Sequence, residues 1–86
     1  MASWQYNFTK SLSSAITSIR TEENQDKVIV CYTSNPQKEY TFNCNKETLE
    51  EIQDLSIGIL ANKETKSLGK TINAMIAEQK LVPVTQ

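Results

Sequence analysis

Two short runs of strand-forming residues, separated by a turn, constrain this chain more than any other feature. Residues 27–33 (KVIVCYT) are apolar at successive positions, and residues 39–44 (EYTFNC) place Tyr40 and Phe42 on one face of a second run. The connecting residues 34–37 (SNPQ) have Asn-Pro at their centre, a composition that is typical of turns. We therefore expect an antiparallel hairpin.

The register of this hairpin decides which side chains enter the core. If the loop is symmetric about residues 35–36, Cys31 faces Tyr40 and Ile29 faces Phe42. All four positions are apolar, so we predict that this face is the core and that Tyr40 and Phe42 are core residues rather than a stacking surface. The opposite face is then expected to stay open and to bind a partner or a second subunit. It carries Val28, Val30, Tyr32 and Thr41.

The N-terminal segment, residues 1–12, alternates aromatic and polar residues. Trp4, Tyr6 and Phe8 recur with a period of two, which predicts a strand or extended arm with one aromatic face. Such an arm either adds a strand to its own sheet or reaches onto another subunit. We favour the subunit interface, so the predicted interface comprises Trp4, Tyr6, Phe8, Val28, Val30 and Tyr32.

Residues 13–19 (SSAITSI) are small and β-branched and predict another strand. Ile16 and Ile19 are out of phase for a flat strand, which indicates a bulge between them.

Two amphipathic helices follow the hairpin. Asn45 is a predicted N-cap for a helix reaching about residue 62, and Ser67 is a predicted N-cap for a second helix. Pro83 ends any helix and leaves residues 81–86 as an extended tail. The predicted fold class is α+β: a small antiparallel sheet of three to four strands followed by two helices packed on one face. Residues 13–80 would form the single domain.

Composition argues against an enzyme. The chain has no histidine, which removes the commonest general base and metal ligand, and we expect no catalytic residue, metal or cofactor. Nine Lys/Arg against ten Asp/Glu give a net charge of −1, whereas nucleic-acid binders normally show a basic excess. The tripeptide GKT at residues 69–71 is not a phosphate-binding loop, because Glu64 occupies the position of the earlier glycine. A small residue at a close helix contact is the better interpretation.

The cysteines and the apolar pattern indicate a cellular compartment. Cys31 and Cys44 are too few for a disulfide framework. The first residues lack the pattern of a signal peptide, and no apolar run approaches the ~20 residues of a membrane span. We expect a cytoplasmic protein with reduced thiols and no membrane partner.

Three segments in the same order resemble the KTSC domain, a short domain at the C-terminus of some lysyl-tRNA synthetases and in small free-standing bacterial and phage proteins. Residues 13–19 are similar to its opening Ser-Ser-x-Ile-x-x-Ile, residues 40–42 to its central Tyr-x-Tyr, and residues 67–76 to its closing Ser-x-Gly-x-x-x-Asn-x-x-Ile. RNA binding has been suggested for this family. A basic residue usual after the closing Ile is replaced here by Ala77.

We therefore predict a non-catalytic, self-associating interaction module that binds a protein or small ligand, compatible with a phage or mobile-element accessory protein. The alternative is a nucleic-acid or nucleotide-binding domain that combines aromatic stacking with a few polar contacts. The candidate contacts for that alternative are Lys63, Lys66, Lys70 and Asn73.

Overall fold

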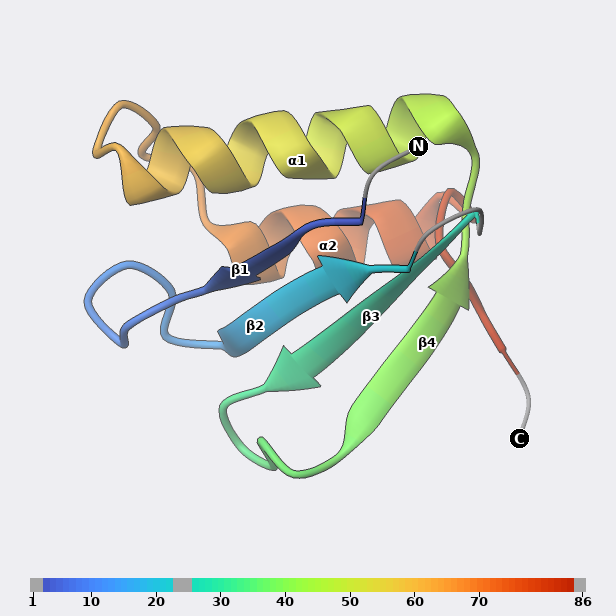
Figure 1. The fold of residues 1–86 in the computed structure, drawn as a ribbon, viewed down its shortest axis with the longest axis horizontal. Coiled ribbons are helices and arrows are strands. Elements are labelled where there is room, and N and C mark those ends of the chain that lie inside the picture. The colour runs from blue at the N-terminus through green and yellow to red at the C-terminus, as the bar shows by residue number, and fades with distance from the viewer. Residues whose placement is uncertain (1–2, 23–25, 85–86) are drawn as a thin grey trace.

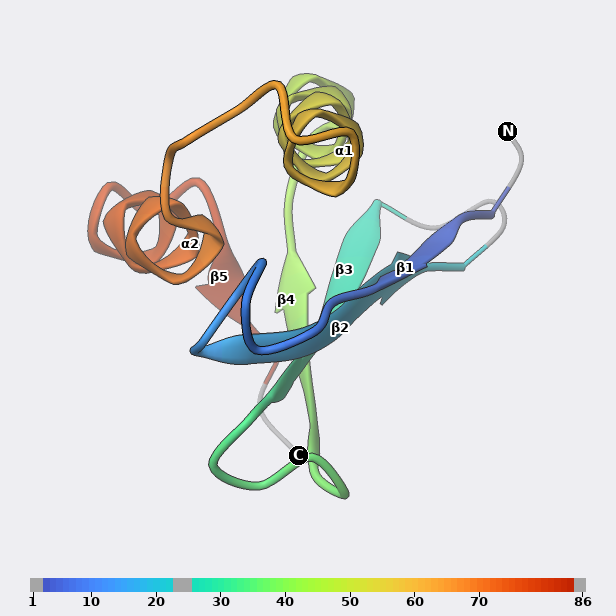
Figure 2. The same ribbon diagram turned by 90° about the vertical axis from the view of Figure 1, so that its left-hand side faces the viewer.

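A computed structural model describes residues 3–22 and 26–84 of the chain, so the extreme ends of the predicted arm and tail lie outside it. Five antiparallel strands form one sheet in the order β1-β2-β3-β4-β5. Both helices lie on one side of this sheet (Figures 1 and 2). The elements are β1 (Gln5–Asn7), β2 (Ile16–Thr21), β3 (Lys27–Tyr32), β4 (Glu39–Asn43), α1 (Lys46–Leu60), α2 (Leu68–Ala77) and β5 (Val82–Pro83).

The predicted α+β class is confirmed, with more strands than expected. The additional strands come from the two ends of the chain. β1 pairs with β2 of its own sheet, and β5 pairs with Phe42 and Asn43 of β4. Phe8 and Leu81 are both buried in the same hydrophobic core as the central strands. The arm therefore belongs to its own sheet, and the expectation that it reaches onto another subunit is wrong for these described residues.

The hairpin forms as predicted, but its register differs by one residue. Cys31 pairs with Glu39 and Val30 pairs with Tyr40, so the loop is symmetric about residue 35. Backbone hydrogen bonds from Asn35 to Tyr32 (3.1 Å) and from Lys38 to Asn35 (3.0 Å) fix this loop. A shift of one residue exchanges the two faces of a strand.

The predicted interface is consequently wrong for Val28 and Val30. Val28 and Val30 are completely buried beneath the helices, and they pair with Phe42 and Tyr40. Tyr32 lies on the same face and is half-buried against the core. The prediction that Tyr40 and Phe42 are core residues is confirmed for Phe42, which is buried. Tyr40 is half-buried and packs against the core.

The face without helices carries two of the four residues that were predicted to form the core. Ile29 and Cys31 point to this side, and both are nevertheless buried. Arg20 of β2 and Glu39 of β4 form an ion pair that spans β3. In the register, Arg20 lies beside Ile29 and Glu39 lies beside Cys31, so the ion pair crosses the strand over these two side chains.

Local signals placed the helices correctly. The side chain of Asn45 accepts a hydrogen bond from the N–H of Thr48 at 2.8 Å, and that of Ser67 accepts one from Lys70 at 3.3 Å. The predicted irregularity between Ile16 and Ile19 is confirmed, since the β2–β3 register shifts between Ile16 and Ser18.

Gly69 provides the close contact expected at the start of α2. A Cβ atom at Gly69 would lie 2.8 Å from the Cβ of Ala15, in the loop before β2. Any side chain there would push α2 away from that loop. The glycine of the GKT tripeptide therefore serves helix packing.

Candidate binding cleft

A cleft of about 570 Å³ opens on the helix side of the β3–β4 hairpin. Its aromatic wall consists of Tyr32 and Tyr40, whose rings meet edge to face at 5.3 Å and 78°. Ile76 of α2 and Val84, which follows β5, contribute apolar walls. The remaining lining residues are Ser34, Lys38, Glu39, Thr41, Phe42 and Pro83.

The cleft exists because the hairpin extends farther than the helix layer. Figure 2 shows the β3–β4 turn projecting away from α1 and α2. At the covered end of the hairpin, Val28 and Phe42 are paired and buried. Toward the turn the same face continues with Tyr32 and Tyr40, which are only half-buried. Large aromatic side chains here complete the edge of the core and also leave ring surface accessible.

One cation lies at the rim of the cleft. The Lys38 ammonium sits 5.0 Å from the centre of the Tyr40 ring, a geometry that favours a cation–π contact. Within the described residues, Lys38 forms no ion pair. Burial raises the pKa of Tyr32, with a smaller contribution from Tyr40. The Tyr32 hydroxyl therefore stays protonated at neutral pH and can donate a hydrogen bond to a ligand.

The carboxylate of Glu39 does not neutralise this cation. Glu39 bonds to Arg20 on the opposite face of the sheet, and that hydrogen bond, followed by the charge of Arg20, lowers its pKa. Lys38 and Glu39 are adjacent in sequence, so their side chains leave the strand on opposite sides. The cleft thus combines aromatic and apolar walls with a positive charge.

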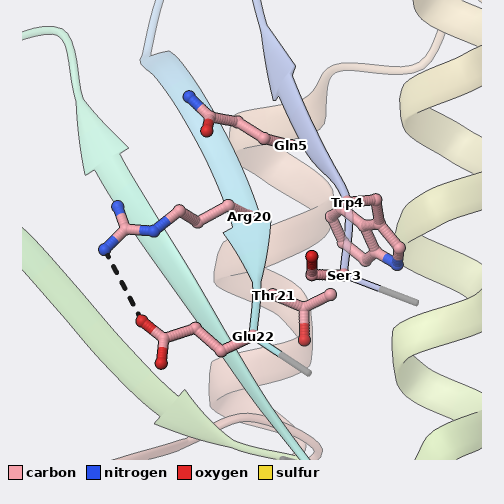
Figure 3. A pocket seen from close by; sticks show the side chains of 6 residues that line it. All are labelled: Ser3, Trp4, Gln5, Arg20, Thr21 and Glu22. Carbon is pink, nitrogen blue, oxygen red and sulfur yellow. Dashed lines mark ion pairs between the residues drawn. The ribbon is translucent and has the colours of Figure 1, made fainter. Parts of the chain in front are cut away.

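A second hollow, of about 440 Å³, lies where β1 and β2 meet. It is lined by Ser3, Trp4, Gln5, Arg20, Thr21 and Glu22 (Figure 3). In Figure 3 the Trp4 ring points toward α1, whereas the Arg20 side chain points away from it, and the dashed line marks its ion pair with Glu22. Arg20 is already paired with both Glu22 and Glu39, so it is not a free cation for a ligand in this hollow.

The structure does not bring the predicted nucleotide contacts together with an aromatic platform. Lys63, Lys70 and Asn73 are all exposed, and Lys66 lines a groove that also contains the acidic residues Glu51, Asp54 and Glu64. Tyr32 lies in the cleft, where Lys38 is the lysine present. Of the predicted aromatic interface, Phe8 is buried, and Trp4 and Tyr6 are half-buried beside each other, with ring centres 5.3 Å apart.

Sequence reasoning missed Lys38 and the cleft-facing side of Tyr40. A signal was present, because Lys38 and Tyr40 are two residues apart and alternate residues of a strand share a face. The correct register was also needed, since only then does Tyr32 join them on that face.

The remaining chemistry of the described residues is sparse. Across residues 3–22 and 26–84, no group of three or more His, Cys, Asp or Glu side chains could hold a metal ion. Cys31 and Cys44 are free thiols, and burial raises the pKa of Cys44 to about 11. Neither α1 nor α2 has the length and apolar character needed to cross a membrane.

Comparison with known proteins gave no significant match: no family model, no curated protein and no solved structure matches this chain. The resemblance to the KTSC domain stays a prediction.

Proposed function

We propose that this protein is a non-catalytic binding module whose ligand occupies the cleft beside Tyr32 and Tyr40. The observation that carries the proposal is the combination of accessible aromatic rings, apolar walls and an ammonium group without an ion-pair partner among the described residues. Ligand sites commonly pair apolar walls with a few polar groups that set orientation.

The chemistry of the walls indicates the class of ligand. The Tyr40 ring and the side chains of Ile76 and Val84 suit a planar, apolar group. Lys38 suits a carboxylate or phosphate attached to that group, because a charge-assisted hydrogen bond to an anion is stronger than a neutral one. We therefore propose an anionic ligand with an aromatic or planar apolar portion.

The titratable groups support a role without catalysis. The four described groups with resolved pKa shifts are Arg20, Tyr32, Glu39 and Cys44. Each shift moves the group's pKa away from neutrality, whereas general acids and bases need values near the working pH. Binding, rather than proton transfer, is the activity that these groups favour.

The test is a titration of isotope-labelled protein with indole-3-acetate, followed by NMR. Backbone signals of Tyr32, Lys38, Tyr40 and Val84 should shift together. Neutral indole-3-acetamide should bind more weakly, and Lys38→Gln should remove the difference between the two compounds. Lys70→Gln changes an exposed lysine outside the cleft and is the matched control.

Two outcomes would contradict the proposal. If millimolar indole-3-acetate shifts none of the cleft signals, the cleft does not bind this class of ligand. If Lys70→Gln weakens binding as much as Lys38→Gln, the site lies elsewhere on the protein.

Nucleotide binding is a second candidate, favoured by the position of Lys38 beside the Tyr40 ring. A base could stack on the ring while the ammonium contacts a phosphate. Adenosine monophosphate should then bind better than adenosine and shift the same cleft signals. For a polynucleotide, affinity for a short RNA should fall as salt rises, and absence of binding at ~50 mM salt would end that idea.

A further inference from the structure

Within residues 3–22 and 26–84, the backbone groups on the outer side of β1 have no hydrogen-bond partner. The N–H of Phe8 bonds to Thr17 at 2.8 Å, and the N–H of Thr21 bonds to the carbonyl of Trp4 at 3.0 Å. In an antiparallel pair, hydrogen-bonded residues alternate with residues whose N–H and C=O point the other way. The backbone groups of Gln5 and Asn7 therefore point out of the sheet, at its edge.

This edge lacks charged residues, proline and bulges, although β1 itself is only three residues long. Proteins protect edge strands with charged residues, proline or bulges. β1 has the sequence Gln-Tyr-Asn and pairs in regular register with β2. At the other edge of the sheet, β5 contains Pro83, which has no N–H to donate. The two edges thus differ in whether a further strand can add to them.

The helix beside β1 carries two of the three exposed large apolar side chains of the described residues. The side-chain amide of Gln53 donates to the Tyr6 hydroxyl at 3.4 Å, so this face of α1 is the one nearest β1. Ile57 and Leu60 follow Gln53 at spacings of four and seven residues, which places them on the same face. They are 47% and 37% exposed. Figure 1 shows α1 running alongside β1.

Charge selects the kind of segment that this surface fits. Glu50 lies seven residues before Ile57, and Asp54 lies three residues before Ile57, where it also lines the groove that contains Lys66; both are exposed. Within the described residues neither forms an ion pair. An incoming segment with lysine or arginine would complement them.

We infer that the β1 edge binds an extended, basic segment of a partner protein as an added strand, with alternate apolar side chains packing against Ile57 and Leu60. Main-chain hydrogen bonds to Gln5 and Asn7 supply affinity, while alternate side chains supply specificity. This surface is separate from the Tyr32–Tyr40 cleft and does not depend on it.

The probe is a short peptide of alternating lysine and valine, compared with one of alternating glutamate and valine. The lysine peptide should slow amide hydrogen exchange at Gln5 and Asn7 and change the fluorescence of Trp4, the only tryptophan. The glutamate peptide should bind much more weakly. Asn7→Pro removes one outward N–H, and it should weaken binding roughly tenfold, as expected for losing about one well-made hydrogen bond.

Further variants separate this surface from others. Ile57→Lys alters α1 without touching β1 and should also weaken binding. Val82→Lys changes an exposed apolar residue on β5 and is the matched control. Circular dichroism confirms that each variant folds.

Three results would overturn the inference. In the first, exchange at Gln5 and Asn7 is unaffected by the lysine peptide. In the second, Asn7→Pro and Ile57→Lys both bind as tightly as the unaltered protein. In the third, light scattering shows a dimer of the free protein that Asn7→Pro converts to monomer, which would assign the edge to a second copy of the chain.

Discussion

Both faces of β3 carry apolar residues, but these residues are buried in different ways. Val28 and Val30 point toward the helices and are 0% exposed. Ile29 and Cys31 point to the face without helices and are 8% and 7% exposed. On one side the cover is a layer of apolar side chains, and on the other it includes the paired side chains of Arg20 and Glu39.

This difference shows that burial alone does not identify the core face. A long charged side chain can cover apolar surface with its aliphatic portion while its charged end stays in water. Arg20 is the neighbour of Ile29 in the β2–β3 register, which places its aliphatic portion where it can cover Ile29 in this way. The outer face can therefore carry apolar residues without a helix or a partner subunit over them.

The largest expected effect is at Phe42, on the covered face. Truncating a buried aromatic residue costs about 3–5 kcal/mol of unfolding free energy, and we expect that cost for Phe42→Ala. Phe42 is only 5% exposed and belongs to the main core cluster. Urea unfolding measures the loss. A cost below ~1 kcal/mol with the fold retained would show that the helix layer does not depend on this ring.

The next prediction concerns Ile29, on the outer face. Ile29→Ala should cost about 2 kcal/mol, the low end for such truncations, because polar side chains above it can settle into the space. Val30→Ala is the matched comparison: it removes fewer atoms from the covered face and should cost as much or more. If Ile29→Ala costs clearly more than Val30→Ala in the same urea assay, the outer face is packed at least as tightly as the covered face.

Local sequence signals predicted the parts of the fold that depend on short-range chemistry. Asn45 and Ser67 could be recognised as helix caps because a capping side chain needs only a backbone N–H a few residues later. In the structure each bonds to the N–H three residues later. The bulge in β2 could be recognised from the phase of Ile16 and Ile19. These features need no knowledge of the partner strand.

The hairpin register could not be obtained in this way. Residues 27–32 are mostly apolar on both faces, so alternation gave no preference for one face. The register then rested on the loop, and a symmetric loop about residues 35–36 or about residue 35 fits the same sequence. Hydrogen bonds within the turn select the loop that is symmetric about residue 35. The prediction used the other loop, so it placed the open face, and with it the candidate site, on the wrong side of β3.

A smaller effect, this time a gain in stability, is expected at Ser56, a buried residue of α1. Its hydroxyl is completely buried on α1 and has no hydrogen-bond partner in the described structure. Ser56→Ala should stabilise the protein by about 1 kcal/mol, because an unsatisfied buried hydroxyl is costly and alanine favours helix. Ser14→Ala, at an exposed position before β2, is the control. A loss of stability in urea unfolding at Ser56→Ala would mean that the hydroxyl is bonded after all.

The smallest expected effect is at Glu39, on the outer face, and it depends on pH. The hydrogen bond and charge of Arg20 lower the pKa of Glu39 in the folded protein, so folding favours its ionised form. This contribution is present above the pKa of the unfolded chain, about 4, and is lost as pH falls through the lower folded value. Glu39→Gln should therefore be slightly less stable than the unaltered protein at neutral pH, and the difference should shrink in acid and in high salt. Glu50→Gln removes a charge that forms no ion pair within the described residues, and it serves as the control in the same urea series. A difference between Glu39→Gln and the unaltered protein that stays constant from neutral pH into acid would show that the ion pair contributes nothing, and that Ile29 and Cys31 are covered without its help.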